Sequence, residues 1–570
     1  MDRITTALLG EFSTEHALEH LEESQRFEHL ASYLCVGRHI SETFETGDVV
    51  VGDGGDTGID AIAIIVNGAL VTDAELVAEL EETNGYLDAT FVFVQAERSS
   101  GFDTAKIGQF LFGVQDFFSD KPALPRNQSV KDAAEVMAAL YQRVSKFKRG
   151  NPACRLYYVT TGKWTADPNL EARRKNAADD LQAMALFRDV EFSPIGADSI
   201  QKLYNQTKNA VSREFTFASR TVVPEMPGVA EAYIGLLPAK EFLSIVEDEG
   251  GELLRGIFYD NVRDWQDYNA VNSEIRETLG NAAMRGRFAL MNNGITVIAK
   301  TLRATGNKFY IEDFQVVNGC QTSHVLHDQR SVIDDSVLVP LRLIGTQDED
   351  VTASIVKATN RQTEVKEEQL LALSDFQKRL ETFFATYPEA QRLYYERRSR
   401  QYNSVSGIEK TRIVTPGSLI RAFASMFLEE PHRTTRSYAA LRSMLGKGIF
   451  GPNHKLEPYY VSALALYRLE YLFRNQALDA KYKPARYHIL LAARLLLTAE
   501  GPPSATANVM LKYCNSLLTT LSDPAKAQSV MLKAAEAVNL VAAGNFDRDN
   551  IRTEPFTDGL KIKCAELRDT

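Results

Sequence analysis

Two short stretches of the chain carry side chains that could hold a divalent metal ion. Asp60 follows the glycine-rich stretch GDGGDTGI, and Gln95 and Glu97 end the apolar run ATFVFVQAE. Side chains two positions apart on a strand point to the same face, so Gln95 and Glu97 would face one way. Their oxygen atoms are of the kind that Mg²⁺ and Mn²⁺ prefer, and a bound ion would activate water for attack on a phosphodiester. The pattern therefore predicts a nuclease site in which Asp60 and Glu97 are metal ligands.

The same residues also have a purely structural interpretation. Acids in glycine-rich turns, such as Asp56, commonly stabilise the turn, and polar side chains such as Gln95 and Glu97 can mark the point where a strand leaves the core. Glu28, in the helical stretch RFEHLASYL, could add a carboxylate from a preceding helix. The spacing alone leaves both interpretations open.

A small α/β unit has to position these side chains. We predict a helix over 13–40, strands over 59–66 and 89–97, a helix over 102–118 and a strand over 154–162. The strand runs are rich in β-branched and aromatic residues and contain no turn residues, which is typical of strands buried on both faces. We expect this first domain to span 1–222 and to end at a linker, VVPEMPG, over 222–228.

The order of these features resembles the restriction-endonuclease-like (PD-(D/E)xK) fold. Glu28, then GIDAIAI, then VQAER follow one another as in the branch of that fold with a glutamine-x-lysine motif on its second strand. The resemblance covers about the first 200 residues. It implies that Asp60 is the principal metal ligand, that Gln95 replaces the usual second acid, and that Glu28 is the helical acid. It also implies Mg²⁺ or Mn²⁺ as the cofactor.

Glu97 departs from that pattern because it stands where the motif has a lysine. A lysine in such a site orients the attacking water and offsets negative charge, and a glutamate reverses the local sign. Two cations could supply the missing charge: Lys106 on the predicted helix 102–118, and Arg98, which is next in sequence. The alternative is that the site has lost its activity.

A second group of polar motifs lies in the middle of the chain. MNNGIT (291–296), VVNGCQTS (316–323) and KATNRQT (357–363) each place amide or hydroxyl side chains at the end of a predicted strand or the start of a helix. One such motif would indicate only a turn or a helix start. Three of them favour a built site, because an amide both donates and accepts hydrogen bonds and can contact a base edge or a phosphate.

This series of motifs resembles the abortive phage infection (AIPR) family over about 255–430, together with NVRDWQDYNAVNSEIRETL (261–279) and YYERRSRQYN (394–403). Members of that family are bacterial defence components, often with a restriction-endonuclease-like N-terminal domain. The NGCQT and TNRQT motifs also resemble, more weakly, DGQHR-type modules related to ParB-like nucleotide-binding folds. The weaker resemblance implies that a nucleotide or a nucleic-acid backbone is bound by Asn318, Gln321, Thr322, Asn360 and Gln362. The shared chemistry of the first motif adds Asn292 and Asn293.

Charge is distributed unevenly along the chain. The net charge of −11 argues against binding of nucleic acid by overall attraction, although a local groove can still be basic. The basic residues of 143–163 fit a solvated helix face. The segment 392–412 interleaves arginines with tyrosines, a combination that suits phosphates and stacked bases. Arg397 and Arg398 are therefore predicted to contact nucleic acid.

The chain as a whole is predicted to be a multidomain α/β protein. After the restriction-endonuclease-like domain we expect a central α/β domain of AIPR type over 229–430 and a helical domain over 431–570. The central domain should contain strands at GITVIAK, KFYIEDFQVV and VLVPLRLIG and a helix over 363–386. The five cysteines are far apart, and no apolar run approaches the ~18 residues of a membrane span. This pattern predicts a reduced, cytoplasmic protein without a membrane anchor.

Two functions fit these observations. The first is a metal-dependent nuclease used in phage defence, with a central domain that binds nucleotide or nucleic acid. The second is a binding module: an inactive nuclease fold that senses nucleic acid or a phage product. Glu97 separates the two, and the presence of Asp60, Gln95 and Glu28 favours the enzyme. The expected partners are nucleic acid (DNA rather than RNA), a nucleotide, a second copy of the chain and a partner defence protein.

Overall fold

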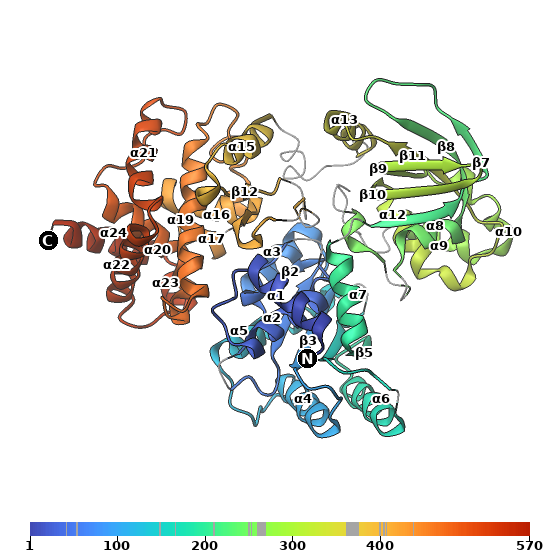
Figure 1. The fold of residues 1–570 in the computed structure, drawn as a ribbon, viewed down its shortest axis with the longest axis horizontal. Coiled ribbons are helices and arrows are strands. Elements are labelled where there is room, and N and C mark those ends of the chain that lie inside the picture. The colour runs from blue at the N-terminus through green and yellow to red at the C-terminus, as the bar shows by residue number, and fades with distance from the viewer. Residues whose placement is uncertain are drawn as a thin grey trace.

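The structure is a computed structural model of the 570-residue chain. It describes residues 1–40, 43–52, 55–147, 150–165, 167–208, 211–248, 251, 253–258, 270–360, 375–397, 401–402, 405, 407–436 and 438–569. These residues form an N-terminal α/β unit, a second α/β unit and a helical C-terminal unit (Figure 1). No helix in the described ranges combines the length and the apolar composition that crossing a membrane requires.

The first unit contains a mixed sheet with helices on both faces. Its strands are β1 (Ala61–Val66), β2 (Ala69–Leu70), β3 (Ala89–Glu97), β4 (Ala153–Thr160) and β5 (Asp189–Ile195). The strand order is β2-β1-β3-β4-β5, in which β1 runs antiparallel to β2 and β3, and β3, β4 and β5 run parallel. One face packs against α1 (Arg3–Glu15), α2 (Glu23–Val36) and α7 (Ala197–Lys208). The other packs against α3 (Ala74–Asn84), α4 (Thr104–Phe117), α5 (Gln128–Tyr141) and α6 (Pro168–Ala183).

Most of the elements predicted for this unit are present. β1, β3, α4 and β4 coincide with the predicted ranges to within a few residues, and every residue of β1 is buried. The prediction of one helix over 13–40 is wrong, because α1 ends at Glu15 and α2 begins at Glu23. Asp2 caps α1 by accepting hydrogen bonds from two backbone N–H groups, so this helix starts well before the predicted range. Ala17 then takes a φ of 52°, which interrupts the helical path.

The second unit contains a six-stranded sheet with the order β6-β10-β9-β11-β8-β7. Its strands are β6 (Ser212–Thr216), β7 (Ser219–Val222), β8 (Glu231–Pro238), β9 (Ile295–Thr305), β10 (Lys308–Asn318) and β11 (Leu338–Gly345). The last three confirm the three predicted strands. Residues 212–222, which the sequence division grouped with the first domain, belong to this sheet instead, because β6 pairs with β10 and β7 pairs with β8.

Helices cover both faces of this second sheet. The main core lies under α8 (Ala239–Val246), α9 (Ala270–Gly280) and α12 (Cys320–Asp328). On the opposite face α13 (Glu349–Asn360) packs on a small cluster formed by Ile298, Val317 and Val356. Two one-turn helices, α10 (Ala282–Arg285) and α11 (Phe288–Met291), precede β9. The face under α13 is therefore the less thickly covered one.

The C-terminal unit is helical apart from one short pair of strands, β12 (Tyr394–Tyr395) and β13 (Ile413–Val414). Its helices are α15 (Asp375–Ala385), α16 (Pro416–Phe427), α17 (Arg433–Arg436), α18 (Tyr438–Arg442), α19 (Glu457–Arg474), α20 (Arg486–Leu497), α21 (Val509–Leu521), α22 (Pro524–Ala542), α23 (Arg548–Ile551) and α24 (Glu554–Asp569). One apolar core joins them from Phe376 to Cys564. The helical character predicted after Pro431 is confirmed, and it extends back to α15.

Candidate functional site

Asp60, Gln95 and Glu97, predicted for the nuclease site, lie where β1 begins and β3 ends. Asp60 precedes β1, and its backbone N–H donates to the carbonyl of Val94 at 3.0 Å, which places Asp60 across the ladder from Gln95. Gln95 and Glu97 continue the alternation of β3, whose earlier odd-numbered residues pack in the core beneath α4. Asp60, Gln95 and Glu97 therefore share the α4 side of the sheet.

The carboxyl group of Asp60 lies in an environment that disfavours its charge. Burial raises its pKa to about 8, and the negative charges of Glu28, Asp56 and Glu97 act in the same direction. The backbone N–H of Ala96 donates to Oδ2 of Asp60 at 2.6 Å and opposes this shift by stabilising the carboxylate. Such a group ionises readily once a cation binds beside it. Glu28 on α2 is near enough to affect this charge.

Lys106 on α4 supplies a cation next to Glu97. Its Nζ lies 2.7 Å from Oε2 of Glu97, and this hydrogen bond raises the pKa of Lys106, with Asp60 acting in the same direction. Arg98, the other substitute considered from the sequence, instead pairs with Glu23 at 3.2 Å on the surface. Lys106 therefore faces the site and Arg98 does not.

Gln95 contributes a buried hydrogen-bond acceptor on the same face. Its Oε1 is buried and has no hydrogen-bond partner in the part of the chain that the structure describes. Leaving such a group unpaired costs about 1–3 kcal/mol, and a bound cation would remove that cost. Within the described ranges no three His, Cys, Asp or Glu side chains lie close enough to hold a metal ion by themselves. The donor set that fits a hard divalent ion is thus Asp60, Glu97 and the amide oxygen of Gln95.

A cleft adjoins this site between the start of α4 and the start of α6. It is lined by residues of 99–106 and 165–176, among them Lys106, Asn169 and Arg173. Arg173 is exposed and lies against α4, because a Cβ built on Gly108 would be 3.8 Å from its Nη1. Arg173 was not among the site residues predicted from the sequence. The sequence feature that could have indicated it is the basic triplet RRK, which follows the first turn of α6.

The second predicted cluster surrounds the start of α12, where β10 ends. Nδ2 of Asn272 on α9 donates to Oε1 of Gln321 at 2.6 Å, and Nδ2 of Asn318 donates to the carbonyl of Thr359 at 2.9 Å. Thr322 is buried in the first turn of α12. These amides therefore join α9, α12, β10 and the end of α13.

The Asn-Asn-Gly turn lies beside this cluster. Asn318 pairs with Thr296 in the ladder of β9 and β10, so the turn that leads into β9 reaches the start of α12. Nδ2 of Asn292 donates to a carbonyl of α11 at 3.3 Å, and Asn293 is exposed. Two of the three polar motifs thus meet at one end of the sheet. Of the third, Asn360 is the last residue of α13, and Gln362 lies outside the described residues, as does Arg398.

Arg397 occupies a different setting from the predicted one. Its guanidinium pairs with Glu381 and with Glu349, each at 2.9 Å, and the residue is 4% exposed. A guanidinium enclosed by two carboxylates presents no surface to a phosphate. The arginine therefore ties α13 to α15, and this structural role replaces the predicted contact with nucleic acid.

Three of the basic residues of 143–163, namely Arg143, Lys146 and Arg155, are held in ion pairs as well. Glu81 pairs with Arg143 at 3.0 Å and with Lys146 at 2.9 Å, and Arg155 pairs with Asp189 at 2.5 Å. These contacts agree with the solvated, structural interpretation of that segment.

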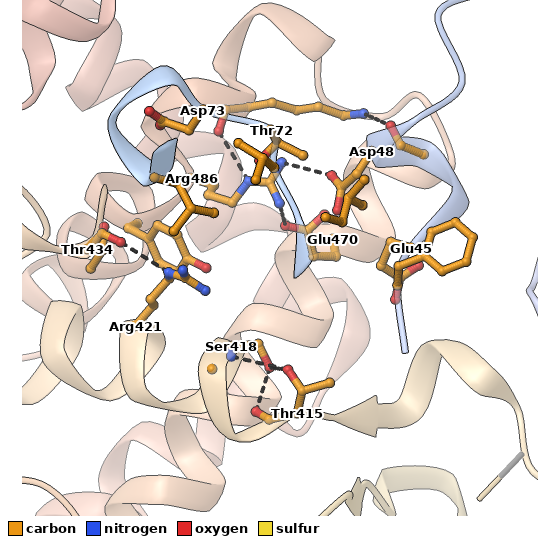
Figure 2. Close-up of a pocket in the computed structure, with 18 of the residues that line it drawn as sticks. Glu45, Asp48, Thr72, Asp73, Thr415, Ser418, Arg421, Thr434, Glu470 and Arg486 are labelled. Atoms are coloured by element: carbon orange, nitrogen blue, oxygen red, sulfur yellow. Dashed lines mark hydrogen bonds and ion pairs between the residues drawn. The ribbon is translucent and has the colours of Figure 1, made fainter. Parts of the chain in front are cut away.

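A large cleft of about 1370 Å³ lies between the first unit and the helical unit. Figure 2 shows the charged and hydroxyl side chains that reach into it, among them Asp48 and Asp73 from the first unit and Arg421 and Arg486 from the helical unit. Arg486 lies 3.7 Å from Asp48 and 3.2 Å from Glu470. No sequence pattern indicated this cleft, because its two walls are distant in sequence.

Residues 258–544 match the model of one protein family, described as AIPR protein, over about half of the chain. The chain belongs to the AIPR family. Membership in the AIPR family suggests a role in abortive infection, that is, in defence against phage. The matched range holds the second sheet from α9 onward, the amide cluster and most of the helical unit, and it excludes the first unit. No curated protein and no solved structure matches the chain.

Proposed function

We propose that this AIPR protein is a metal-dependent nuclease of anti-phage defence whose first unit has a restriction-endonuclease-like fold. One observation carries the proposal: Nζ of Lys106 lies 2.7 Å from Glu97 on the face that also holds Asp60 and Gln95. The positive charge that the motif places on β3 is thereby supplied from α4. The resulting set of two carboxylates, one amide oxygen and one ammonium group suits hydrolysis of a phosphodiester.

Each polar residue of the site in the first unit has a proposed role. Asp60, Gln95 and Glu97 would hold Mg²⁺ or Mn²⁺, which when bound lowers the pKa of the attacking water and neutralises phosphate charge. Lys106 holds the carboxylate of Glu97 in position through their hydrogen bond. The burial that raises the pKa of Asp60 would strengthen its attraction to a bound cation. The cleft beside Lys106 and Arg173 would hold the nucleic-acid strand.

In this proposal the second unit binds a nucleotide or nucleic acid through the amide cluster at the start of α12. Asn318, Gln321 and Thr322 support it because they gather hydrogen-bonding groups from four elements at one end of the sheet. A neutral amide cluster can contact both base edges and phosphates.

The proposal is tested by plasmid nicking with Mn²⁺, with and without EDTA. We expect the wild-type chain to nick DNA and EDTA to stop it, and we expect Asp60→Ala and Lys106→Ala to lose at least roughly 100-fold in rate. Lys175→Ala is a matched control, since it removes an exposed lysine of α6 outside the lining of the cleft. RNA is tested as a second substrate. If neither plasmid nor RNA is cleaved at any Mn²⁺ concentration, the result would favour the alternative, an inactive nuclease fold that acts as a binding module.

A further inference from the structure

The cleft beside the proposed metal site is bounded by two loops that parallel strands bring together. β3 and β4 pair as far as Glu97 and Thr160, so the loops that follow them leave the sheet at the same end. The hydroxyl and the backbone N–H of Thr161 both donate to the carbonyl of Ser99, at 3.0 and 3.1 Å, which ties the two loops to each other. Ligands of α/β sheets commonly bind beyond the carboxyl ends of the strands, which is where this cleft lies.

An aromatic side chain of the first loop lines this cleft. Phe102, just before α4, is half-buried, and its ring packs edge-to-face on Trp164 of the second loop, with the ring centroids 4.8 Å apart. The ring of Tyr158 on β4 lies 6.0 Å from that of Phe102. Tyr158 is paired with Gln95 across the ladder, so Phe102 lies near the proposed metal site. These contacts hold the ring of Phe102 in place and leave part of it open to the cleft.

A polar face of α6 forms another wall of the same cleft. Asn169, Arg173 and Asn176 lie four and three residues apart, so they project from one side of the helix, and all three line the cleft. Arg173 is exposed and takes part in no ion pair or hydrogen bond with any residue that the structure describes. A guanidinium of this kind can bind phosphate oxygens, and the two exposed amides can donate to and accept from a base.

The charged side chains of the cleft differ in what they already contact. Lys106 lines the cleft and pairs with Glu97 at 2.7 Å, so this cation belongs both to the cleft and to the proposed metal site. Two carboxylates, Asp103 and Asp167, also line the cleft. Each of them caps a helix by accepting hydrogen bonds from backbone N–H groups of the first turn, of α4 and of α6 respectively. Arg173 is therefore the cation of this cleft that is available to an anionic ligand.

We propose that this cleft binds an unpaired strand of nucleic acid, with one base stacked on Phe102 and a neighbouring phosphate on Arg173. The inference rests on the proposed nuclease function and names the class of substrate that its site takes. The cleft has a volume of about 1190 Å³, which exceeds the roughly 300–1,000 Å³ of pockets for small molecules and suits a polymer. Bases of a duplex are stacked on one another, so a side-chain ring can stack only on a base of an unpaired strand. Negative supercoiling favours local strand opening, so nicking of plasmid is compatible with this preference.

Strand preference is measured on the full chain in EDTA, so that binding is observed without cleavage. A fluorescein-labelled oligonucleotide is titrated by anisotropy as single-stranded DNA, as single-stranded RNA of the same sequence and as the DNA duplex. We expect at least one of the single strands to bind at least roughly tenfold more tightly than the duplex. The tighter of the two single strands identifies the sugar that the cleft prefers.

Variants of the cleft assign this binding to its residues. Phe102→Leu keeps an apolar side chain and removes the aromatic face, so it should weaken single-strand binding roughly 5- to 150-fold, the loss expected for one stacked base, whereas Phe102→Tyr should retain most of the affinity. Arg173→Ala should weaken binding several-fold and reduce the slope of log K against log salt by about 0.7, as expected for one phosphate of a single strand. Phe112→Ala and Lys175→Ala are matched controls, because both side chains are exposed, on α4 and α6, and lie outside the lining of the cleft.

Three results would overturn the inference: no binding of either single strand by the wild-type chain, binding of the duplex as tight as that of both single strands, or equal single-strand affinities of wild type and Phe102→Leu. Thermal unfolding of each variant separates a binding defect from a folding defect, and Arg173→Ala, which alters an exposed side chain, tests the cleft if Phe102→Leu unfolds. Plasmid nicking by the same preparations separates this inference from the proposed nuclease, because Asp60→Ala should abolish nicking and retain single-strand binding. A wild-type chain that binds single strands through Phe102 and never nicks plasmid would overturn the nuclease and support the strand-binding cleft.

Discussion

At the scale of single residues, Glu97 decides how the first site carries its charge. Its side chain is 21% exposed and already pairs with Lys106. Glu97→Lys would place a second ammonium group beside Lys106 and remove a carboxylate, so we expect nicking with Mn²⁺ to fall roughly 100-fold. Arg98→Ala, which alters the neighbouring surface cation, should retain wild-type activity. A gain of activity in Glu97→Lys would show instead that the site lost activity when glutamate replaced the lysine of the motif at position 97.

Asp60 should give the metal-free protein a characteristic pH dependence of stability. Burial raises its pKa from 3.8 to about 8. Between these values the folded chain holds a proton that the unfolded chain has released, so the free energy of unfolding should fall as the pH rises from about 4 to about 8. Asp60→Asn removes the titrating group, and its free energy of unfolding should fall less over that window. Urea unfolding in EDTA at several pH values compares the two, and parallel curves would contradict a buried, protonated Asp60.

At the scale of elements, the positions of the strands were predicted more accurately from the sequence than the sheets to which the strands belong. The central runs of β1, β3, β9, β10 and β11 are apolar and bounded by turn residues, so local composition was sufficient to find them. The helix over 13–40 was wrong because a helical pattern continues through Ala17, whose φ of 52° no periodicity reveals. Residues 212–222 were grouped with the wrong sheet because their partners, β10 and β8, lie elsewhere in the sequence.

The site residues show the same difference between local features, which the sequence predicts, and contacts between distant segments, which it does not. The spacing of Asp60, Gln95 and Glu97 was sufficient to place them on one face, since strand alternation is local. The role of Arg397 could not be predicted, because it depends on which carboxylates and helices come near its guanidinium in the fold. Arg397 was predicted from the sequence to contact phosphate, and in the fold it is enclosed by Glu349 and Glu381.

The junction between β10 and α12 should depend on glycine. Gly319 has a φ of +98°, and a Cβ there would lie 2.6 Å from a side-chain atom of Ile295 and 3.1 Å from its Cα. Gly319→Ala combines backbone strain with a steric clash, so we expect it to cost about 2–5 kcal/mol of stability. Gly306 has a φ of +60° with nothing near its added Cβ, and Gly306→Ala should cost only about 1 kcal/mol. Urea unfolding measures both, and equal costs would mean that the close approach to Ile295 relaxes easily.

At the scale of the whole molecule, polar contacts hold the first unit against the helical unit. Arg552 beside α23 forms an ion pair with Asp73 at the start of α3, and it lies 3.3 Å from Glu75. The backbone N–H of Tyr438 donates to Glu79 at 2.8 Å, and α17 packs against α3. The helical unit therefore contacts the first unit through α3, beside the cleft of Figure 2. A change in the helical unit has a direct physical route to the first unit.

The Asp73–Arg552 pair offers a test of how firmly the two units are joined. The side chains are 14% and 7% exposed, so removing one partner leaves the other charge largely buried and should cost about 1–3 kcal/mol. Asp73→Asn should retain the cap that this residue makes to the N–H of Glu75. Small-angle scattering of Arg552→Met should show a larger radius of gyration if the pair closes the junction. Lys240→Ala, which removes an exposed pair with Asp335, should change neither property.

A double-mutant cycle then isolates the pair itself. If Asp73 and Arg552 act mainly on each other, the double variant Asp73→Asn/Arg552→Met should lose less stability than the sum of the two single variants, because neither charge remains buried alone. The radius of gyration of the double variant should return to the wild-type value only if apolar contacts are sufficient to hold the two units together. Additive losses would mean that Arg552 acts chiefly through Glu75, and an unchanged radius of gyration in every variant would assign the docking of the two units to their remaining contacts around α3 and α17.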